Sequence, residues 1–329
     1  MGNEVLTNRA ASLVRRLRIA FLFPGQGEQY EGMLHALSVH PAARSTMQEA
    51  NAVLGKDSYL LDSKTALQST VSAQLCIFIA GVAFARVMES EGAMPDAVAG
   101  LSVGAFAAAV TAGVVDFAAL LPVIHLRAEM MESAFPVGYG LSVILGLTLS
   151  EISGLVRECH SANDPVYLAN LNGPRQFVIA GSVRGQNQVL QKAKALGAGK
   201  AEPLPVTTPS HCPLLKGVSH KLLNAISDIQ FRQPRIPYVS NRNARLLRSA
   251  QAILEDVATN VEYPVYWYDS MTILYEQGVR LFVEAPPGQS LSKLVVESLP
   301  ECRALAFQLT PLRSLLYRMA QESKSSCLD

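Results

Sequence analysis

Short apolar runs and longer helical stretches alternate along the first part of the chain. Ile19–Phe23 and Ala97–Ala99 are short and continuously apolar, which predicts two strands. Longer periodic stretches predict helices near residues 43–54, 70–90, 104–112 and 116–134. Strands that alternate with helices in this way predict an α/β fold with a largely parallel sheet.

The pattern changes between about residues 140 and 206. Strands are predicted at 141–145, 166–170, 176–180 and 201–206, and helices at 148–160 and 183–196. This β-α-β-β-α-β order is that of a ferredoxin-like unit. We therefore expect a small ferredoxin-like subdomain, residues 139–206, inserted into a large α/β-hydrolase-like subdomain formed by residues 18–138 and 207–322.

The α/β pattern resumes after the insertion, and a cleft between the two lobes is the expected place for a site. Predicted strands lie at 236–240, 281–285 and 305–309, and predicted helices at 249–258, 266–277, 289–298 and 311–321.

Both ends of the chain carry short additional segments. Leu6, Ala10, Leu13 and Leu17 lie at helical spacing, so residues 1–17 are predicted to form a helical extension packed on the domain. No apolar stretch follows Arg15 and Arg16, so this segment does not resemble a signal peptide. Residues 323–329 are polar and predict a flexible tail.

Composition excludes several classes of protein. The 28 basic and 27 acidic residues leave a net charge of +1, so the chain offers no basic field for nucleic acid or for a membrane surface. No uncharged apolar run approaches the ~20 residues of a spanning helix, and Ile77–Val87 predicts a buried helix. The 5 scattered cysteines contain no CxxC pair, which favours free thiols in a reducing cytoplasm over disulfides or a zinc site.

Gly100-Leu101-Ser102-Val103-Gly104 is the strongest chemical signal. It follows the apolar run at 97–99 and precedes an alanine-rich helical stretch. A strand, a sharp turn and a helix in this order hold a serine hydroxyl clear of the backbone at a helix N-terminus. The two glycines allow the cramped turn, because a Cβ at either position would clash. Ser102 is therefore a candidate nucleophile.

A serine nucleophile needs a base, and His211 is the best candidate among the 6 histidines. It lies in Thr208-Pro209-Ser210-His211-Cys212-Pro213, a turn bounded by prolines that follows the inserted unit. Position alone equally fits a capping or solvated loop histidine, and the paired serine elbow favours the base. His125 lies in an apolar run and is interpreted as a helix-face residue.

An oxyanion hole completes this kind of site. The backbone N–H of Val103, at a helix N-terminus, suits a developing negative charge. A second donor is expected from the loop Pro24-Gly25-Gln26-Gly27-Glu28-Gln29, whose glycines allow backbone to approach a ligand closely. Taken alone, that loop is better interpreted as an ordinary turn.

Five segments together resemble the malonyl-CoA:acyl carrier protein transacylase family over about residues 18–310. They carry the loop motif, the nucleophile elbow, an arginine motif, a histidine motif and a late glycine motif: Phe23–Gln29, Gly100–Gly104, Leu126–Met131, Pro209–Cys212 and Val283–Gly288. The family also has an inserted ferredoxin-like subdomain, in agreement with the pattern at 139–206.

The resemblance implies a role for each matching residue. Ser102 would be the acylated nucleophile and His211 its general base. The N–H groups of Gln26 and Val103 would form the oxyanion hole. A backbone carbonyl, here that of Asn260, would orient the histidine in place of an aspartate. Gln74 resembles a glutamine that lines the same pocket, although the proline that usually follows it is missing.

Arg127 decides the substrate class. It lies in the largely apolar stretch Leu120–Met131, where burying an unpaired charge is costly. Most arginines are surface or ion-paired residues, but a guanidinium matches a carboxylate bidentately. In the resembling family this arginine holds the free carboxylate of malonyl. The resemblance thus implies malonyl-CoA as substrate, CoA and an acyl carrier protein as partners, and neither a bound cofactor nor a metal.

Three positions depart from the family pattern. Leu101 stands where most members carry histidine, Ala105 where many carry glutamate, and Ala128 where many carry glycine. Leu101 makes the substrate pocket less polar. The run from Gly100 to Phe106 is most similar to the malonyl transferase (epsilon) subunit of bacterial malonate decarboxylase, which implies the subunits of that complex as partners.

Two other function classes compete with this hypothesis. A serine hydrolase of the α/β-hydrolase type shares Gly-x-Ser-x-Gly but needs an acidic residue between the serine and a late histidine. No acidic residue before His211 lies in a recognisable motif. Within the transferase class, a trans-acting malonyltransferase of fatty-acid or polyketide synthesis is the alternative to a malonate decarboxylase subunit. A non-catalytic carrier-docking protein is disfavoured, because Ser102, His211 and Arg127 are all present.

Overall fold

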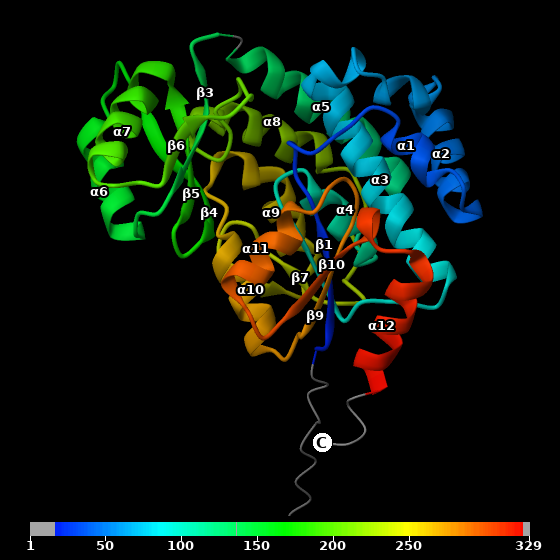
Figure 1. Cartoon of the computed structure of the whole chain (residues 1–329). Coiled ribbons are helices and arrows are strands. Elements are labelled where there is room, and N and C mark those ends of the chain that lie inside the picture. The colour runs from blue at the N-terminus through cyan, green and yellow to red at the C-terminus, as the bar shows by residue number, and fades with distance from the viewer. Residues whose placement is uncertain (1–16, 136, 325–329) are drawn as a thin grey trace, which may run out of the picture.

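Two β-sheets organise the protein (Figure 1). The computed structural model describes residues 17–135 and 137–324. The larger sheet has 6 strands in the order β10-β9-β1-β2-β7-β8 and is parallel except for the β7–β8 pair. Its strands are β1 (Ile19–Phe23), β2 (Ala97–Gly100), β7 (Tyr238–Val239), β8 (Leu246–Leu247), β9 (Leu281–Glu284) and β10 (Arg303–Ala306). The predicted α/β class with a mostly parallel sheet is confirmed.

Helices cover both faces of this sheet, as the side-chain alternation of its strands requires. In β1, Phe21 and Phe23 belong to the larger hydrophobic core, whereas Ala20 and Leu22 belong to a second core on the opposite face. The helices that contribute to the larger core are α1 (Met33–Leu37), α2 (Pro41–Leu54), α3 (Thr70–Ser90), α4 (Gly104–Thr111), α5 (Phe117–Ala134), α8 (Lys216–Ile226), α9 (Ala250–Thr259) and α12 (Leu312–Lys324). The second core is formed with α10 (Trp267–Glu276) and α11 (Ser290–Ser298).

Helix α3 runs through the larger core. It is long and apolar enough to cross a membrane by length and composition, but 83% of its most apolar window is buried inside the protein. Its side chains pack against α2, α4 and α5. The predicted buried helix around Ile77–Val87 is therefore observed.

The second sheet is antiparallel and has 4 strands in the order β4-β5-β3-β6. With α6 and α7 it forms the green lobe at the left of Figure 1. Its elements are β3 (Tyr139–Leu145), α6 (Leu149–Cys159), β4 (Val166–Gly173), β5 (Gln176–Ser182), α7 (Val183–Ala195) and β6 (Lys200–Pro203). The β-α-β-β-α-β order agrees with the sequence pattern, and the division of the chain at 139 and 206 stays a prediction.

Several boundaries differ from the predicted ones. β6 and β10 begin earlier than the apolar pattern indicated, and β10 ends at Ala306 because β9, its partner, offers only 4 residues. Phe307 then leaves the sheet and packs its ring on Phe84. Helix α12 extends to Lys324, so Ser323 and Lys324 are helical, not tail. The predicted helix before Leu17 and the rest of the tail lie outside the described residues.

Helix α8 was not predicted, although Val218, Leu222 and Ile226 recur at helical spacing and are buried. Short 3-10 turns were also missed: η1 (Ser58–Asp62), η2 (Ala66–Gln68), η3 (Pro213–Leu215), η4 (Asn260–Glu262) and η5 (Phe307–Leu309).

Candidate active site

Ser102 lies in a sharp turn between β2 and α4. Its φ of 56° places it in the left-handed region, which non-glycine residues rarely adopt. A Cβ on Gly100 would lie 2.2 Å from the carbonyl carbon of Gly104, and one on Gly104 would lie 2.1 Å from the carbonyl oxygen of Phe23. Both glycines are therefore sterically required, and the turn has the geometry of a nucleophile elbow.

His211 lies directly against this serine. Its Nε2 is 2.9 Å from Ser102 Oγ, and its Nδ1 is 2.8 Å from the carbonyl oxygen of Asn260. A carbonyl oxygen only accepts hydrogen bonds, so Nδ1 carries the proton and Nε2 accepts from the serine hydroxyl. The orientation by the Asn260 backbone is the one that the sequence resemblance implied. The arrangement can remove a proton from Ser102.

The charge state of His211 suits a base. Its pKa is lowered to about 4, mainly by burial and also by the positive charge of Arg127, while hydrogen bonds to Asn260 and Tyr263 act in the opposite direction. The ring is therefore neutral at pH 7. Its backbone N–H donates to the carbonyl of Val261 at 2.7 Å, which holds a residue whose φ is 64°.

Arg127 points its guanidinium at the serine from α5. The residue is fully buried, and within the described residues no carboxylate forms an ion pair with it. Nη1 donates to Gln74 Oε1 at 2.5 Å, Nη2 donates to Ser102 Oγ at 3.2 Å, and the group lies over the ring of Phe106. Burial lowers the Arg127 pKa to about 9, so the charge persists at pH 7.

Gln74 holds Arg127 from the facing helix α3. Its side chain is buried, its Oε1 accepts from Arg127, and its Nε2 contacts Met131 Sδ at 3.5 Å. The amide is thus oriented with its oxygen toward the guanidinium. This contact replaces one water that the cation lost on burial and leaves other N–H groups of Arg127 for a ligand.

The loop after β1 packs closely against the nucleophile elbow. A Cβ on Gly25 would lie 2.7 Å from Leu101 Cδ2, so only glycine allows this approach. Glu28 anchors the loop to α11, since its Oε2 accepts the N–H groups of Ser290 and Gln289. Gln26 and Val103 line the cleft beside Ser102. In the described part of the chain, neither backbone N–H donates to a protein acceptor.

A cleft of about 490 Å³ joins these groups between the two sheets. Ser102, His211 and Arg127 line it from the larger sheet's side, and apolar side chains of the smaller sheet close it. Those apolar residues are Leu141, Val143, Val178 and Leu204. A largely apolar cleft with few convergent polar groups is typical of a substrate site.

Comparison with known proteins agrees with this geometry. Residues 20–315 match the acyl transferase domain family. The malonyl CoA-acyl carrier protein transacylase of Salmonella typhimurium is 35% identical over 86% of this chain and 94% of that protein, and the Bacillus subtilis protein of the same name is 34% identical over 84% and 89%.

Solved structures agree as well. The malonyl CoA-acyl carrier protein transacylase from Coxiella burnetii superposes with a TM-score of 0.88 at 31% identity, covering 93% of this chain and 98% of that one. A malonyl-transacylase solved with the holo acyl carrier protein of a type II polyketide synthase has a TM-score of 0.86 at 34% identity, covering 92% and 99%. The chain belongs to the malonyl-CoA:acyl carrier protein transacylase family.

Within this transacylase family, Leu101 is the departure next to the nucleophile. Its half-buried side chain packs against the second core, and a Cβ on Gly25 would strike it. Leu101 supplies no polar group beside Ser102. Among the described residues, two cations line the cleft, Arg127 and Lys293, and Arg127 is the one hydrogen-bonded to Ser102.

Asn241 is the site residue that sequence reasoning missed. It follows β7, the strand next to β2, and its side chain contacts the backbone on both sides of Leu101. The available signal was a polar residue directly after the predicted strand 236–240. Because neighbouring parallel strands end at one edge of a sheet, that residue had to lie near the elbow.

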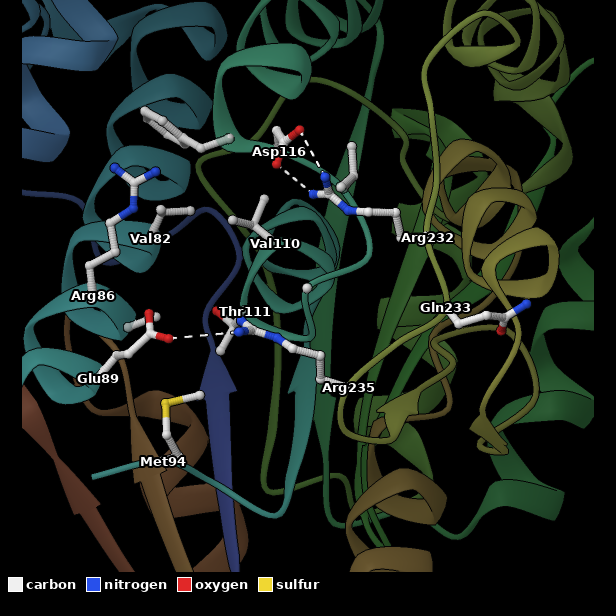
Figure 2. Close-up of a pocket in the computed structure, with 14 residues that line it drawn as sticks. Val82, Arg86, Glu89, Met94, Val110, Thr111, Asp116, Arg232, Gln233 and Arg235 are labelled. Atoms are coloured by element: carbon white, nitrogen blue, oxygen red, sulfur yellow. Dashed lines mark hydrogen bonds and ion pairs between the residues drawn. The ribbon is translucent and has the colours of Figure 1, made fainter. Parts of the chain in front are cut away.

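A second pocket has a volume of about 440 Å³. One of its lining residues, Met94, lies before β2 in the chain, whereas Ser102 lies after β2. Figure 2 shows Arg232 paired with Asp116 and Arg235 facing Glu89. Thr111, its hydroxyl residue, donates to a carbonyl of its own helix. Among the described residues that line this pocket there is no histidine. Among the described residues, no group of histidine, cysteine and acidic side chains could hold a metal.

Proposed function

We propose that the protein transfers malonyl from malonyl-CoA to the thiol of an acyl carrier protein through a malonyl-Ser102 intermediate. The observation that carries the proposal is the position of Arg127. Its buried guanidinium has no carboxylate partner among the described residues and lies 3.2 Å from the oxygen whose proton His211 can take. A site built in this way favours a substrate that brings its own negative charge to the reacting atom.

The length of malonyl fits this spacing. In an acyl-serine the carbonyl carbon is bonded to Oγ, and the malonyl carboxylate lies one methylene beyond that carbon. The guanidinium already touches Oγ, so a carboxylate at that short reach can pair with it. Acetyl would leave the buried charge unpaired, which costs binding free energy and disfavours acetyl-CoA.

The first half-reaction uses His211 as a base. Nε2 takes the Ser102 proton while Oγ bonds to the thioester carbonyl carbon. The N–H groups of Gln26 and Val103 then donate hydrogen bonds to the oxyanion of the tetrahedral intermediate. On collapse the carbon–sulfur bond breaks, and His211 returns the proton to the CoA thiolate. The products are malonyl-Ser102 and free CoA.

The second half-reaction runs in reverse with a carrier thiol. His211 takes the thiol proton, the sulfur bonds to the acyl carbon, and the ester bond to Oγ breaks. The same histidine reprotonates Ser102. In both half-reactions the substrates and the protein's own side chains supply every proton and leaving group. Malonyl-CoA therefore enters as a substrate, and the scheme calls for no resident cofactor.

A carrier protein is the proposed acceptor because a related transacylase was solved with one. The relatives are named for malonyl CoA-acyl carrier protein transfer, which fits a trans-acting enzyme of fatty-acid or polyketide synthesis. The finer prediction, an acceptor within malonate decarboxylase, is supported by the sequence run Gly100–Phe106 alone. The 4 described cysteines are free and buried, which supports the proposed location in the cytoplasm.

The contacts of His211 disfavour the hydrolase alternative. An α/β-hydrolase would place an aspartate or glutamate on Nδ1. Here the Nδ1 partner is the Asn260 carbonyl, and within the described residues no carboxylate bonds to the ring.

Mass spectrometry of the intact protein tests the proposal. Incubation with malonyl-CoA and no acceptor should add one malonyl group at Ser102, and holo acyl carrier protein should then remove it as malonyl carrier. Ser102→Ala is the control and should stay unmodified. Rapid release of free malonate without a carrier would instead indicate a hydrolase, and an unmodified wild type would indicate a non-catalytic docking protein.

A further inference from the structure

The backbone N–H of Ser102 is held by a side chain from a distant segment. The Ser102 N–H donates to Asn241 Oδ1 at 3.0 Å, and Asn241 Nδ2 donates to the Gly100 carbonyl at 2.7 Å. The two bonds lie on either side of Leu101. Ser102 has a φ of 56°, a conformation that persists only where surrounding contacts enforce it. Asn241 provides those contacts.

Asn241 is itself fixed on both sides. Its N–H donates to Asp256 Oδ2 at 3.2 Å, and its carbonyl accepts from the N–H of Tyr266 at 2.9 Å. Asp256 is buried and also accepts the hydroxyl groups of Tyr238 and Ser240. The loop after β7 therefore has little freedom to move relative to α9.

Helix α9 connects the Asn241–Asp256 contact to the base, His211. Asp256 is near its C-terminal end, and Asn260 follows one turn later in η4. The Asn260 carbonyl accepts from His211, and its side-chain Nδ2 donates to the Ser102 carbonyl at 3.3 Å. One rigid element thus holds the nucleophile through Asn241 and the base through Asn260.

We propose that Asn241, held by Asp256, is a positioning residue that sets Ser102 Oγ against His211. It contacts only backbone groups of the elbow. Because it occupies the Ser102 N–H, the Val103 N–H is the elbow donor left for the oxyanion. The proposal deepens the proposed function and rests on it.

The test compares Asn241→Ala, Asn241→Asp and wild type, with Asn243→Ala as the matched control. Asn243 lies in the same loop, is exposed, and accepts only from Arg245. Two rates are measured on each folded protein: malonylation of Ser102 in a single turnover, and labelling of Ser102 by a fluorophosphonate probe. Thermal unfolding is recorded for each variant.

Asn241→Ala should slow both rates about 10²-fold, the scale that a displaced reacting atom produces. The KM for malonyl-CoA should change less than about threefold, because binding groups remain in place. Asn243→Ala should match wild type in both rates.

Asn241→Asp provides a readout that altered folding alone does not predict. Its ionised carboxyl keeps an acceptor for the Ser102 N–H but turns a second oxygen toward the Gly100 carbonyl. Protonation restores a donor there. Relative to wild type, its rates should therefore rise as the pH falls from about 8 to 6, whereas those of Asn241→Ala should not.

Three outcomes would overturn the inference: wild-type rates in folded Asn241→Ala, a loss confined to KM, or a pH-independent Asn241→Asp. If Asn241→Ala does not fold, the pH profile of Asn241→Asp decides. If the fluorophosphonate labels the wild type but malonyl-CoA does not modify it, malonyl transfer is rejected. The labelling rates of the variants then still test the role of Asn241. No labelling of wild type by either reagent would reject both.

Discussion

Arginine side chains line both the cleft and the second pocket, but their surroundings in the two places differ. In the second pocket, the side chains of Arg232 and Arg235 are 46% and 61% exposed, and each faces a carboxylate (Figure 2). In the cleft, Arg127 is 0% exposed, and its hydrogen-bond acceptors are the neutral oxygens of Gln74 and Ser102.

This difference separates a structural arginine from a functional one. Exposed ion pairs contribute about 0–1 kcal/mol, because water screens both charges. A buried guanidinium without a counter-ion has lost its hydration without compensation, which is costly unless a ligand supplies the charge. We therefore expect substitutions in the cleft to change catalysis, and substitutions in the second pocket to leave it unchanged.

The largest effect is expected at the base. His211→Ala should lower the rate of Ser102 malonylation by about 10²-fold or more, because general-base assistance is lost. His125→Ala is the control, since His125 is a part-exposed residue paired with Glu129 on the α5 surface. The measurement is the single-turnover rate of adduct formation. If His125→Ala showed the loss and His211→Ala did not, the choice of histidine would be wrong.

Selectivity should change next, at Arg127. Arg127→Ala should reduce the ratio of kcat/KM for malonyl-CoA over acetyl-CoA at least about tenfold, because a charge-assisted hydrogen bond contributes roughly 1.5–3 kcal/mol. Arg127→Lys should recover the ratio only in part, since an ammonium group lacks the planar fork. Arg232→Ala is the matched control and should retain the wild-type ratio. An unchanged ratio in Arg127→Ala would make this arginine structural.

The pH profile connects Arg127 with His211. The His211 pKa is lowered to about 4, so acylation should be independent of the base's charge at neutral pH and fall only as the pH approaches that value. Arg127 is one cause of the lowering, after burial. Arg127→Met should therefore raise the His211 pKa and move the acid limb of kcat/KM to higher pH. A limb that stayed in place, or moved to lower pH, would contradict this coupling.

The smallest effect is expected in the second pocket. Arg232→Ala removes an exposed pair with Asp116 and should leave the free energy of unfolding nearly unchanged, with malonyl transfer unchanged. Thermal or urea unfolding measures the first quantity, and the steady-state transfer rate measures the second. A loss of activity without unfolding would show that this pocket influences the cleft.

Most elements of the fold could be predicted because their signals are local. The continuous apolar run at β1, the helical stretch at α3 and the glycines of the elbow each reflect sterics or burial within a few residues. Ser102 and His211 were both predicted as site residues, and the structure places them 2.9 Å apart. Their catalytic roles stay predictions that the experiments above test.

Contacts between distant segments could not be predicted from such local signals. Asn241 contacts the elbow across 139 positions, and its role depends on β7 pairing with β2. The end of β10 at Ala306 depends on the length of its neighbour β9. Neither relation leaves a periodic pattern in the residues concerned.

The sequence by itself determined the α/β class, the strained elbow at Ser102 and the presence of an arginine in an apolar helix, because chain sterics and side-chain hydrophobicity act over short ranges. Tertiary structure alone decided that this arginine has no carboxylate partner among the described residues, that His211 is neutral, and that Asn241, bonded to Asp256 of α9, and Asn260, at the end of α9, hold serine and histidine. The physical reason is that desolvation and hydrogen-bond partners are properties of a position in space, which many distant residues together define.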